Sequence, residues 1–289
     1  MLGYLVPFVN AELRAIPIFA LYFVAERLLS AKRFDFRAWA FDWQYFLLWV
    51  LGNSVILALL VLAGRKTLEN WAAHHQLVMH LGRLHPVLKQ LVILFAFDLF
   101  YYWFHRTQHT TALWPQHAIH HSETHLNAAT AFRHHILENA VKVPLVDVPL
   151  MFIFVQTVWT NDRGLLTQIA AGFVAYLGVF AHSNLRIGFG PLNWLIISPQ
   201  THRIHHSVEE QHWNRNFAAY FPVIDVIFGT YYHPAPGEFP DTGIPGVGLK
   251  LNTLPAAFAH PFREWASMIR DHRMRRDGLA PHARLRDQL

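Results

Sequence analysis

Histidine side chains gather in three short clusters in the middle of the 289-residue sequence. The clusters are His105 with His109, then His117, His120 and His121, and then His202, His205 and His206. Spacings of three and four residues put side chains on one face of a helical turn, so each cluster can direct two or three imidazole rings at one point. Imidazole is the commonest protein ligand for transition metals, and these eight rings exceed the four ligands of one tetrahedral ion. The pattern therefore predicts a centre of two metal ions, which we expect to be iron.

The two clusters with three histidines carry most of this interpretation. Adjacent protonated imidazoles would repel each other, so such a cluster is stable only when its rings are neutral and bound to a metal. The pair His105 and His109 alone would be typical of a solvated helix surface. We expect His182, at the end of an apolar segment, to be a ninth ligand. For His135 the ligand and non-ligand interpretations stay open.

Carboxylates near the clusters are candidates for orienting the metal ligands. A carboxylate can accept the second N–H of a metal-bound imidazole and so fix its tautomer. Asp98 lies in an apolar segment seven residues before His105, where a buried charge is costly and usually functional. Its distance along the helix predicts a histidine partner on a neighbouring helix. Glu123 and Glu138 are further candidates, each equally consistent with a surface role.

Missing residues and motifs exclude several other kinds of chemistry. The sequence has no cysteine, which excludes disulfides, thiolate metal sites, iron–sulfur clusters and thiol nucleophiles. It contains no HExxH, GxSxG, Walker or GxGxxG motif. The clusters also lack the Glu-x-x-His pairs of carboxylate-bridged di-iron bundles.

The composition predicts an integral membrane protein. Hydrophobic residues make up 53% of the sequence and charged residues only 15%, well below the usual quarter. Residues 43–64 contain no charge over 22 positions, which is long enough to cross the hydrocarbon core as a helix. Residues 4–28 are apolar but interrupted by charges, which is consistent with a further spanning helix or an interfacial one.

The remaining apolar segments predict where the clusters lie. Residues 91–104 form a short apolar run, which we expect to continue as a helix through His105 and His109. Residues 143–161 and 165–182 read as a helical hairpin that crosses the membrane and returns. All three clusters then lie at one membrane face, for which we favour the cytoplasmic side. The predicted fold is an all-α integral membrane protein with four to five transmembrane helices and a helical, histidine-rich cytoplasmic cap.

The chain reads as one integrated domain in three parts. Residues 1–89 hold the first transmembrane and interfacial helices, with an amphipathic surface helix in 65–89, and residues 90–233 hold the catalytic core. Residues 234–289 are the third part: we expect an irregular loop over 233–262 and a basic amphipathic helix over 261–277. The arginine-rich tail favours anionic lipid headgroups over nucleic acid, which we do not expect as a partner.

The motifs resemble those of the fatty acid hydroxylase/sterol desaturase superfamily over residues 90 to 233. The resemblance rests on the histidine clusters and on motifs around Asn127, Arg133-His134-His135-x-x-Glu138, His182-Ser-Asn, Asn216-Phe-Ala and Asp225-x-x-x-Gly229-Thr230-Tyr231. They are closer to the bacterial sterol-desaturase-like and alkylglycerol-monooxygenase-like branch than to the yeast sphingolipid hydroxylases. In the latter, a histidine stands at the position of Arg186, so one ligand is missing here or comes from elsewhere, with His135 as first candidate.

The resemblance implies a membrane-bound, non-haem di-iron enzyme that uses O2 to hydroxylate or desaturate a C–H bond of a lipid. Sterols, fatty acyl chains and ether lipids are the implied substrates. The ten histidines named above would bind two iron ions, and Asp98, Glu138 and Asn216 would support them. A separate ferredoxin or cytochrome reductase system would supply electrons, and the bacterial inner membrane is the implied location.

Two other classes of function compete with this interpretation. The histidines of a zinc or copper transporter should lie within the membrane along a pathway, whereas these clusters follow the apolar segments. An inactive family member that only binds lipid is the third possibility, and the intact clusters argue against it.

Overall fold

A computed structural model describes residues 16–48, 84–147, 149–150, 176–244 and 251–276, together with positions 52, 70 and 74. Every regular element in these ranges is helical, as predicted, and two residues form an isolated β-bridge. The labelled elements are, in chain order, α2 (Ile16–Leu29), α4 (Pro86–Gln108), α5 (Trp114–His121), η2 (Ala128–Phe132), α6 (Ile136–Lys142), η3 (Val143–Asp147), η4 (Gly190–Trp194), α10 (Pro199–His205), η5 (Glu210–His212), α11 (Val223–Phe228) and α12 (Leu254–Arg276).

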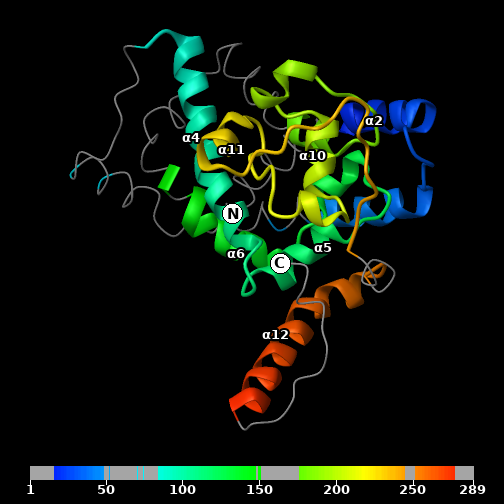
Figure 1. The fold of residues 1–289 in the computed structure, drawn as a ribbon, viewed down its shortest axis with the longest axis vertical. Coiled ribbons are helices and arrows are strands. Elements are labelled where there is room, and N and C mark those ends of the chain that lie inside the picture. The colour runs from blue at the N-terminus through cyan, green and yellow to red at the C-terminus, as the bar shows by residue number, and fades with distance from the viewer. Residues whose placement is uncertain are drawn as a thin grey trace.

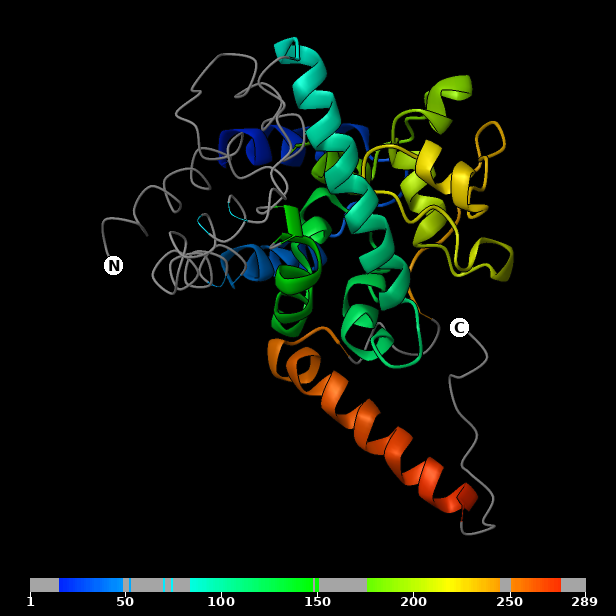
Figure 2. The same ribbon diagram turned by 90° about the vertical axis from the view of Figure 1, so that its left-hand side faces the viewer.

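Helix α4 is a long rod that runs from the top of the view in Figure 2 down to its middle. The His85 side chain caps its first turn by accepting from the Val87 N–H at 3.4 Å. The predicted run at 91–104 therefore belongs to a longer helix, which includes His105 and ends with His109 as its C-cap. In the part of the chain that the structure describes, residues 87–108 are the one segment long and apolar enough to cross a membrane.

The predicted span at 43–64 lies mostly outside the described residues, as do much of the predicted hairpin, residues 4–15 and most of 65–89. The number of transmembrane helices therefore stays a prediction.

Short helices α5 and α10 carry the two three-histidine clusters, and both begin with a proline in the first turn. Proline is favoured there because its fixed φ suits a helix and its missing N–H would have no partner. The Ser198 side chain caps α10 by accepting from the Thr201 N–H at 3.2 Å. His206 follows as the C-cap of α10. The helical geometry predicted from the spacing of the clusters is thus present.

The N-terminal segment is tied to the middle of the chain by buried acidic side chains. One carboxylate oxygen of Glu26, in α2, accepts from the Ala128 N–H at 2.9 Å and the Asn184 N–H at 2.8 Å. Asp42 accepts from the side chains of Asn127 and Thr130, which cap η2. These bonds hold the segment that follows the second histidine cluster, and the segment that follows His182, against the N-terminal part of the chain.

The C-terminal helix α12 begins at Leu254, seven residues earlier than predicted, so the expectation of an irregular loop through 262 is wrong. Pro261 lies inside this helix rather than before it. The N-terminal half of α12 packs against α5, with Ala257 buried in a core cluster that also contains Ile119. Figure 1 shows that the rest of the helix projects away from the body of the molecule.

Candidate metal centre

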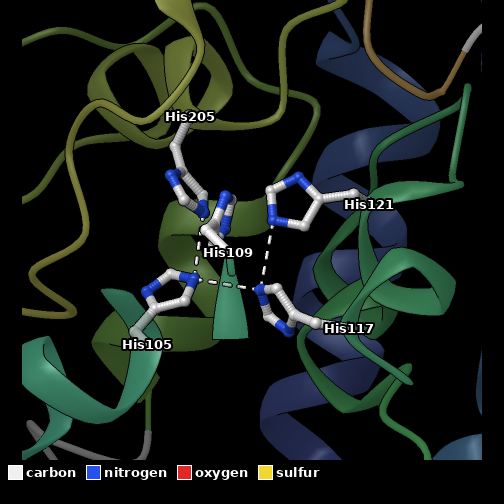
Figure 3. Close-up of side chains that lie close together, drawn as sticks. All are labelled: His105, His109, His117, His121 and His205. Atoms are coloured by element: carbon white, nitrogen blue, oxygen red, sulfur yellow. Dashed lines mark hydrogen bonds between the residues drawn. The ribbon is translucent and has the colours of Figure 1, made fainter. Parts of the chain in front are cut away.

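Nine histidines meet in two groups. Site A consists of His105, His109, His117, His121 and His205, and site B consists of His120, His182, His202 and His206. Within each group, the candidate ligand atoms all lie within 4.8 Å of one another. Figure 3 shows the rings of site A turned toward a common centre from α4, α5 and α10. The structure thus brings together all the predicted ligands except His135, and their role in binding metal stays a prediction.

Helices α5 and α10 each contribute to both sites, in opposite proportions. In α5, His117 and His121 are one turn apart and belong to site A, whereas His120 points into site B. In α10, His202 and His206 belong to site B, whereas His205 reaches site A. A cluster therefore directs two rings at one point and its third ring at the other, rather than three rings at one point.

Hydrogen bonds to backbone carbonyls fix the tautomers of two rings in site A. Nδ1 of His105 donates to the Phe217 carbonyl, and Nδ1 of His205 donates to the Arg215 carbonyl, each at 2.7 Å. A carbonyl only accepts, so the proton of each neutral ring is on Nδ1 and Nε2 presents a lone pair. These two Nε2 atoms are 3.0 Å apart. Two lone pairs at that distance repel each other, and a shared cation removes the repulsion. The donor set therefore fits a transition metal.

The surroundings of the rings favour the neutral form that metal binding requires. Burial, and then the neighbouring imidazoles, lower the pKa of His109, His121 and His206 well below the usual value. Burial likewise lowers the pKa of His205 to about 3. A metal ion therefore does not compete with a proton for these nitrogens near neutral pH.

Glu138, in helix α6, is hydrogen-bonded to a histidine ring of site A and so fixes the orientation of that ring. One of its carboxylate oxygens accepts from Nδ1 of His117 at 3.2 Å, from Nδ1 of His134 at 3.0 Å, and from the Gln108 side chain. Burial raises the pKa of Glu138, but the attraction of His134 and His117 outweighs burial and holds the pKa well below its usual range. The site-supporting role predicted for Glu138 has a geometric basis in these contacts.

We expect Glu138→Gln to weaken metal retention by about 10- to 100-fold, as loss of a partner to a ligand's second nitrogen typically does. One carboxylate oxygen accepts from three side chains and the other accepts from the His135 N–H, so an amide would place its NH2 group against a donor in either orientation. The measurement is metal content by mass spectrometry after dialysis against a graded series of chelator concentrations. Glu210→Gln, at an exposed position, is the matched control. Equal retention in both variants would contradict the prediction.

Asp98 does not contact an imidazole, contrary to prediction. Its fully buried carboxylate accepts from the backbone N–H groups of residues 219, 220 and 221 at 2.7, 3.0 and 2.6 Å. The reason is that this face of α4 packs against the loop before α11 rather than against another histidine-bearing helix. Asp98 therefore acts on the loop that holds His105 rather than on a ring. Asn216 supports the same loop: its side-chain oxygen accepts from the Tyr232 N–H, and its amide donates to the Thr201 and Tyr232 carbonyls.

His135 and Glu123 lie outside both sites. Nδ1 of His135 accepts from the Leu137 N–H, and Nε2 donates to the Phe258 carbonyl at 3.2 Å, so both ring nitrogens are occupied. His135 is the N-cap of α6 and contacts α12. His135 therefore does not supply the ligand that is missing at position 186, where this chain has Arg186. Site B has four histidines without it. Glu123 accepts from Arg133 and from the His125 N–H.

Sequence reasoning missed the backbone groups that orient the rings. The carbonyls of Arg215, Phe217 and Gly178 each accept from a histidine, and no residue type marks a carbonyl for this role. It also gave His134 no place at the centre. The His134 ring stacks on the His120 ring with centroids 4.2 Å apart.

Comparison with known proteins places this geometry in context. The profile of the fatty acid hydroxylase family matches residues 90–230, which contain all nine histidines of sites A and B. An ornithine lipid hydroxylase of Rhizobium tropici is 30% identical over 162 residues, covering 56% of this chain and 46% of that protein. The human alkylglycerol monooxygenase is 26% identical over 171 residues, covering 59% of this chain and 36% of the enzyme.

A third relative is a very-long-chain aldehyde decarbonylase of rice (subspecies japonica). It is 28% identical over 144 residues, covering 46% of this chain and 21% of the decarbonylase. This chain thus spans less than half the length of each relative. No solved structure matches it.

Proposed function

This chain belongs to the fatty acid hydroxylase family, within the fatty acid hydroxylase/sterol desaturase superfamily, and from that membership we propose that it is a membrane-bound, non-haem di-iron oxygenase. It would use O2 to hydroxylate or desaturate a C–H bond of a lipid. One observation carries the proposal: nine buried or nearly buried histidines converge in two adjacent groups. Such a donor set suits two transition-metal ions.

The histidines of the centre would bind the iron ions, and the aromatic residues around them would keep water out. Sites A and B would each hold one iron, and the bound pair would activate O2 for attack on an unactivated carbon. Phe217 packs its ring 5.0 Å from that of His109 and 5.7 Å from those of His105 and His205. Trp114 packs 5.2 Å from His109 and 5.3 Å from His121. These aromatic rings would exclude water from the ligands, so that the oxidising equivalents reach substrate.

The relatives suggest the substrate class and the setting. One is named for hydroxylation of ornithine lipids and another for oxygenation of alkylglycerols, so a membrane lipid is the substrate that we propose. Electrons would come from a separate ferredoxin or cytochrome reductase. We place the enzyme in a bacterial inner membrane with its centre on the cytoplasmic side.

The test is iron content and oxygen uptake. Protein purified anaerobically in detergent would be supplied with ferrous iron, freed of excess metal, and given a reductant and membrane lipids. We expect about two irons per chain and lipid-stimulated O2 consumption, with mass spectrometry of the lipids giving the product. The opposite outcome is tightly held zinc or copper that iron does not replace, with no O2 uptake under any lipid. That result would favour a binding or transport protein instead.

A further inference from the structure

The two sites differ in the hydrogen bonds that the Nδ1 atoms of their histidine rings make. In site A, the Nδ1 atoms of at least three of the five rings have a partner, and a fourth ring, that of His109, has a side-chain hydrogen bond with Asn214. Those of His105 and His205 donate to backbone carbonyls, and that of His117 donates to Glu138. A partner on the second nitrogen fixes the ring's tautomer and orientation and raises the basicity of the coordinating nitrogen.

In site B, a single ring has such a partner. Nδ1 of His182 donates to the Gly178 carbonyl at 2.7 Å. The Nδ1 atoms of His120, His202 and His206 are buried and have no hydrogen-bond partner among the described residues. A buried N–H without an acceptor loses its hydration without compensation, so these rings are held in coordinating geometry mainly by packing.

Residues 215–221 form one continuous segment that supplies both carbonyls of site A, and two carboxylates fix it. Asp225 accepts from the N–H groups of residues 217 and 218 at 2.7 and 2.9 Å, and Asp98 accepts from the next three. Five consecutive backbone donors are thereby bound, and both carboxylates are fully buried. Thr230 adds a bond to Asp225 at 2.7 Å. The segment is therefore rigid where it meets the rings.

From this difference we infer that the two metal positions are unequal: site A holds its ion tightly, site B is the exchangeable position, and Asp98 and Asp225 are positioning residues for site A. The inference rests on the two-metal centre proposed above. Site A has five histidines, and at least three of their rings have a hydrogen-bond partner on Nδ1. Site B has four histidines, and one ring has such a partner. Loss of one such hydrogen-bond partner typically weakens metal affinity by about 10- to 100-fold.

The test follows metal release from the 289-residue chain in nanodiscs. The metal-free protein is loaded with Zn2+, which is redox-inert, and then exposed to an excess of a chromogenic chelator. We expect two Zn2+ per chain, released in two phases of equal amplitude whose rates differ by at least about tenfold. Two Zn2+ released in a single phase would overturn the inference. Fewer than two Zn2+ bound would contradict the dinuclear centre itself.

Variants assign the phases to the sites. His206→Ala should remove the fast phase and leave the slow one. Asp225→Asn should accelerate the slow phase by about tenfold or more and leave the fast phase unchanged. Thr230→Val removes a hydroxyl that is bonded to Asp225 and to Tyr102. It should act in the same direction more weakly, and it serves if Asp225→Asn does not fold by circular dichroism. Asp241→Asn, at an exposed carboxylate, should change neither phase. If Asp225→Asn and Thr230→Val accelerate both phases equally, the assignment is wrong.

Discussion

Replacing His205 with alanine should reduce lipid-dependent O2 consumption by at least about 100-fold, since loss of a ligand costs more than loss of its partner. His205 is the one residue by which α10 reaches site A, and its Nε2 lies 3.0 Å from that of His105. The alanine removes a coordinating nitrogen and leaves the Arg215 carbonyl without its donor. Metal content should fall from about two ions per chain to about one. His120→Ala should act likewise through site B.

His85→Ala is the control for this experiment. His85 lies at the N-terminus of α4, where its side chain caps the helix, and belongs to neither site. Loss of the cap should cost about 1 kcal/mol of stability and leave metal content and turnover unchanged. Full activity in His205→Ala would refute the assignment of His205 as a ligand. Loss of activity in His85→Ala would show that residues outside sites A and B also belong to the metal centre.

Arg133→Met should destabilise the protein by about 3–5 kcal/mol, because it leaves two buried carboxylates without their cation. The Arg133 side chain, only 3% exposed, donates to Asp42 at 3.0 Å and to Glu123 at 2.5 Å. It also donates to the backbone carbonyls of Ile119, in α5, and Leu251. The loss therefore affects α5, which carries three of the nine histidines, as well as the ion pairs.

The measurement is the midpoint of thermal unfolding in detergent, followed by circular dichroism. A loss of this size corresponds to a drop in the midpoint on the order of 10 °C for a chain of this length. Arg263→Met, at an exposed position of α12, is the matched control and should shift the midpoint by little. A shift in Arg133→Met no larger than in the control would show that the buried network does not stabilise the fold.

The sequence predicts which histidines meet, because spacings of three and four residues are a local property of a helix. It does not predict how the rings divide between the sites. His120 and His121 are adjacent in the chain, yet a rotation of about 100° along the helix sends them to different sites. Which site each ring reaches depends on the packing of α5 against α10, whose residues are some eighty positions apart. No local pattern contains that information.

The supporting groups are harder still to predict. Asp98 stands out in the sequence as a carboxylate in an apolar helix, but its partners are backbone N–H groups of a distant loop. Backbone groups are the same at every residue and leave no trace in the residue types. The start of α12 was misplaced for a related reason. Pro and Gly predict a break, whereas burial of Ala257 and Leu251 in the core beside α5 favours an earlier start.

The reciprocal division of rings between α5 and α10 has a consequence for folding. Each ion would bind ligands from both helices, so the two ions together would close a loop of about eighty residues. The entropic cost of closing such a loop grows only slowly with its length. Because every ion draws ligands from both helices, neither helix can be released by giving up one ion alone. Assembly of the core would then be coupled to iron supply, and chains made under iron starvation would present the core segments to proteases.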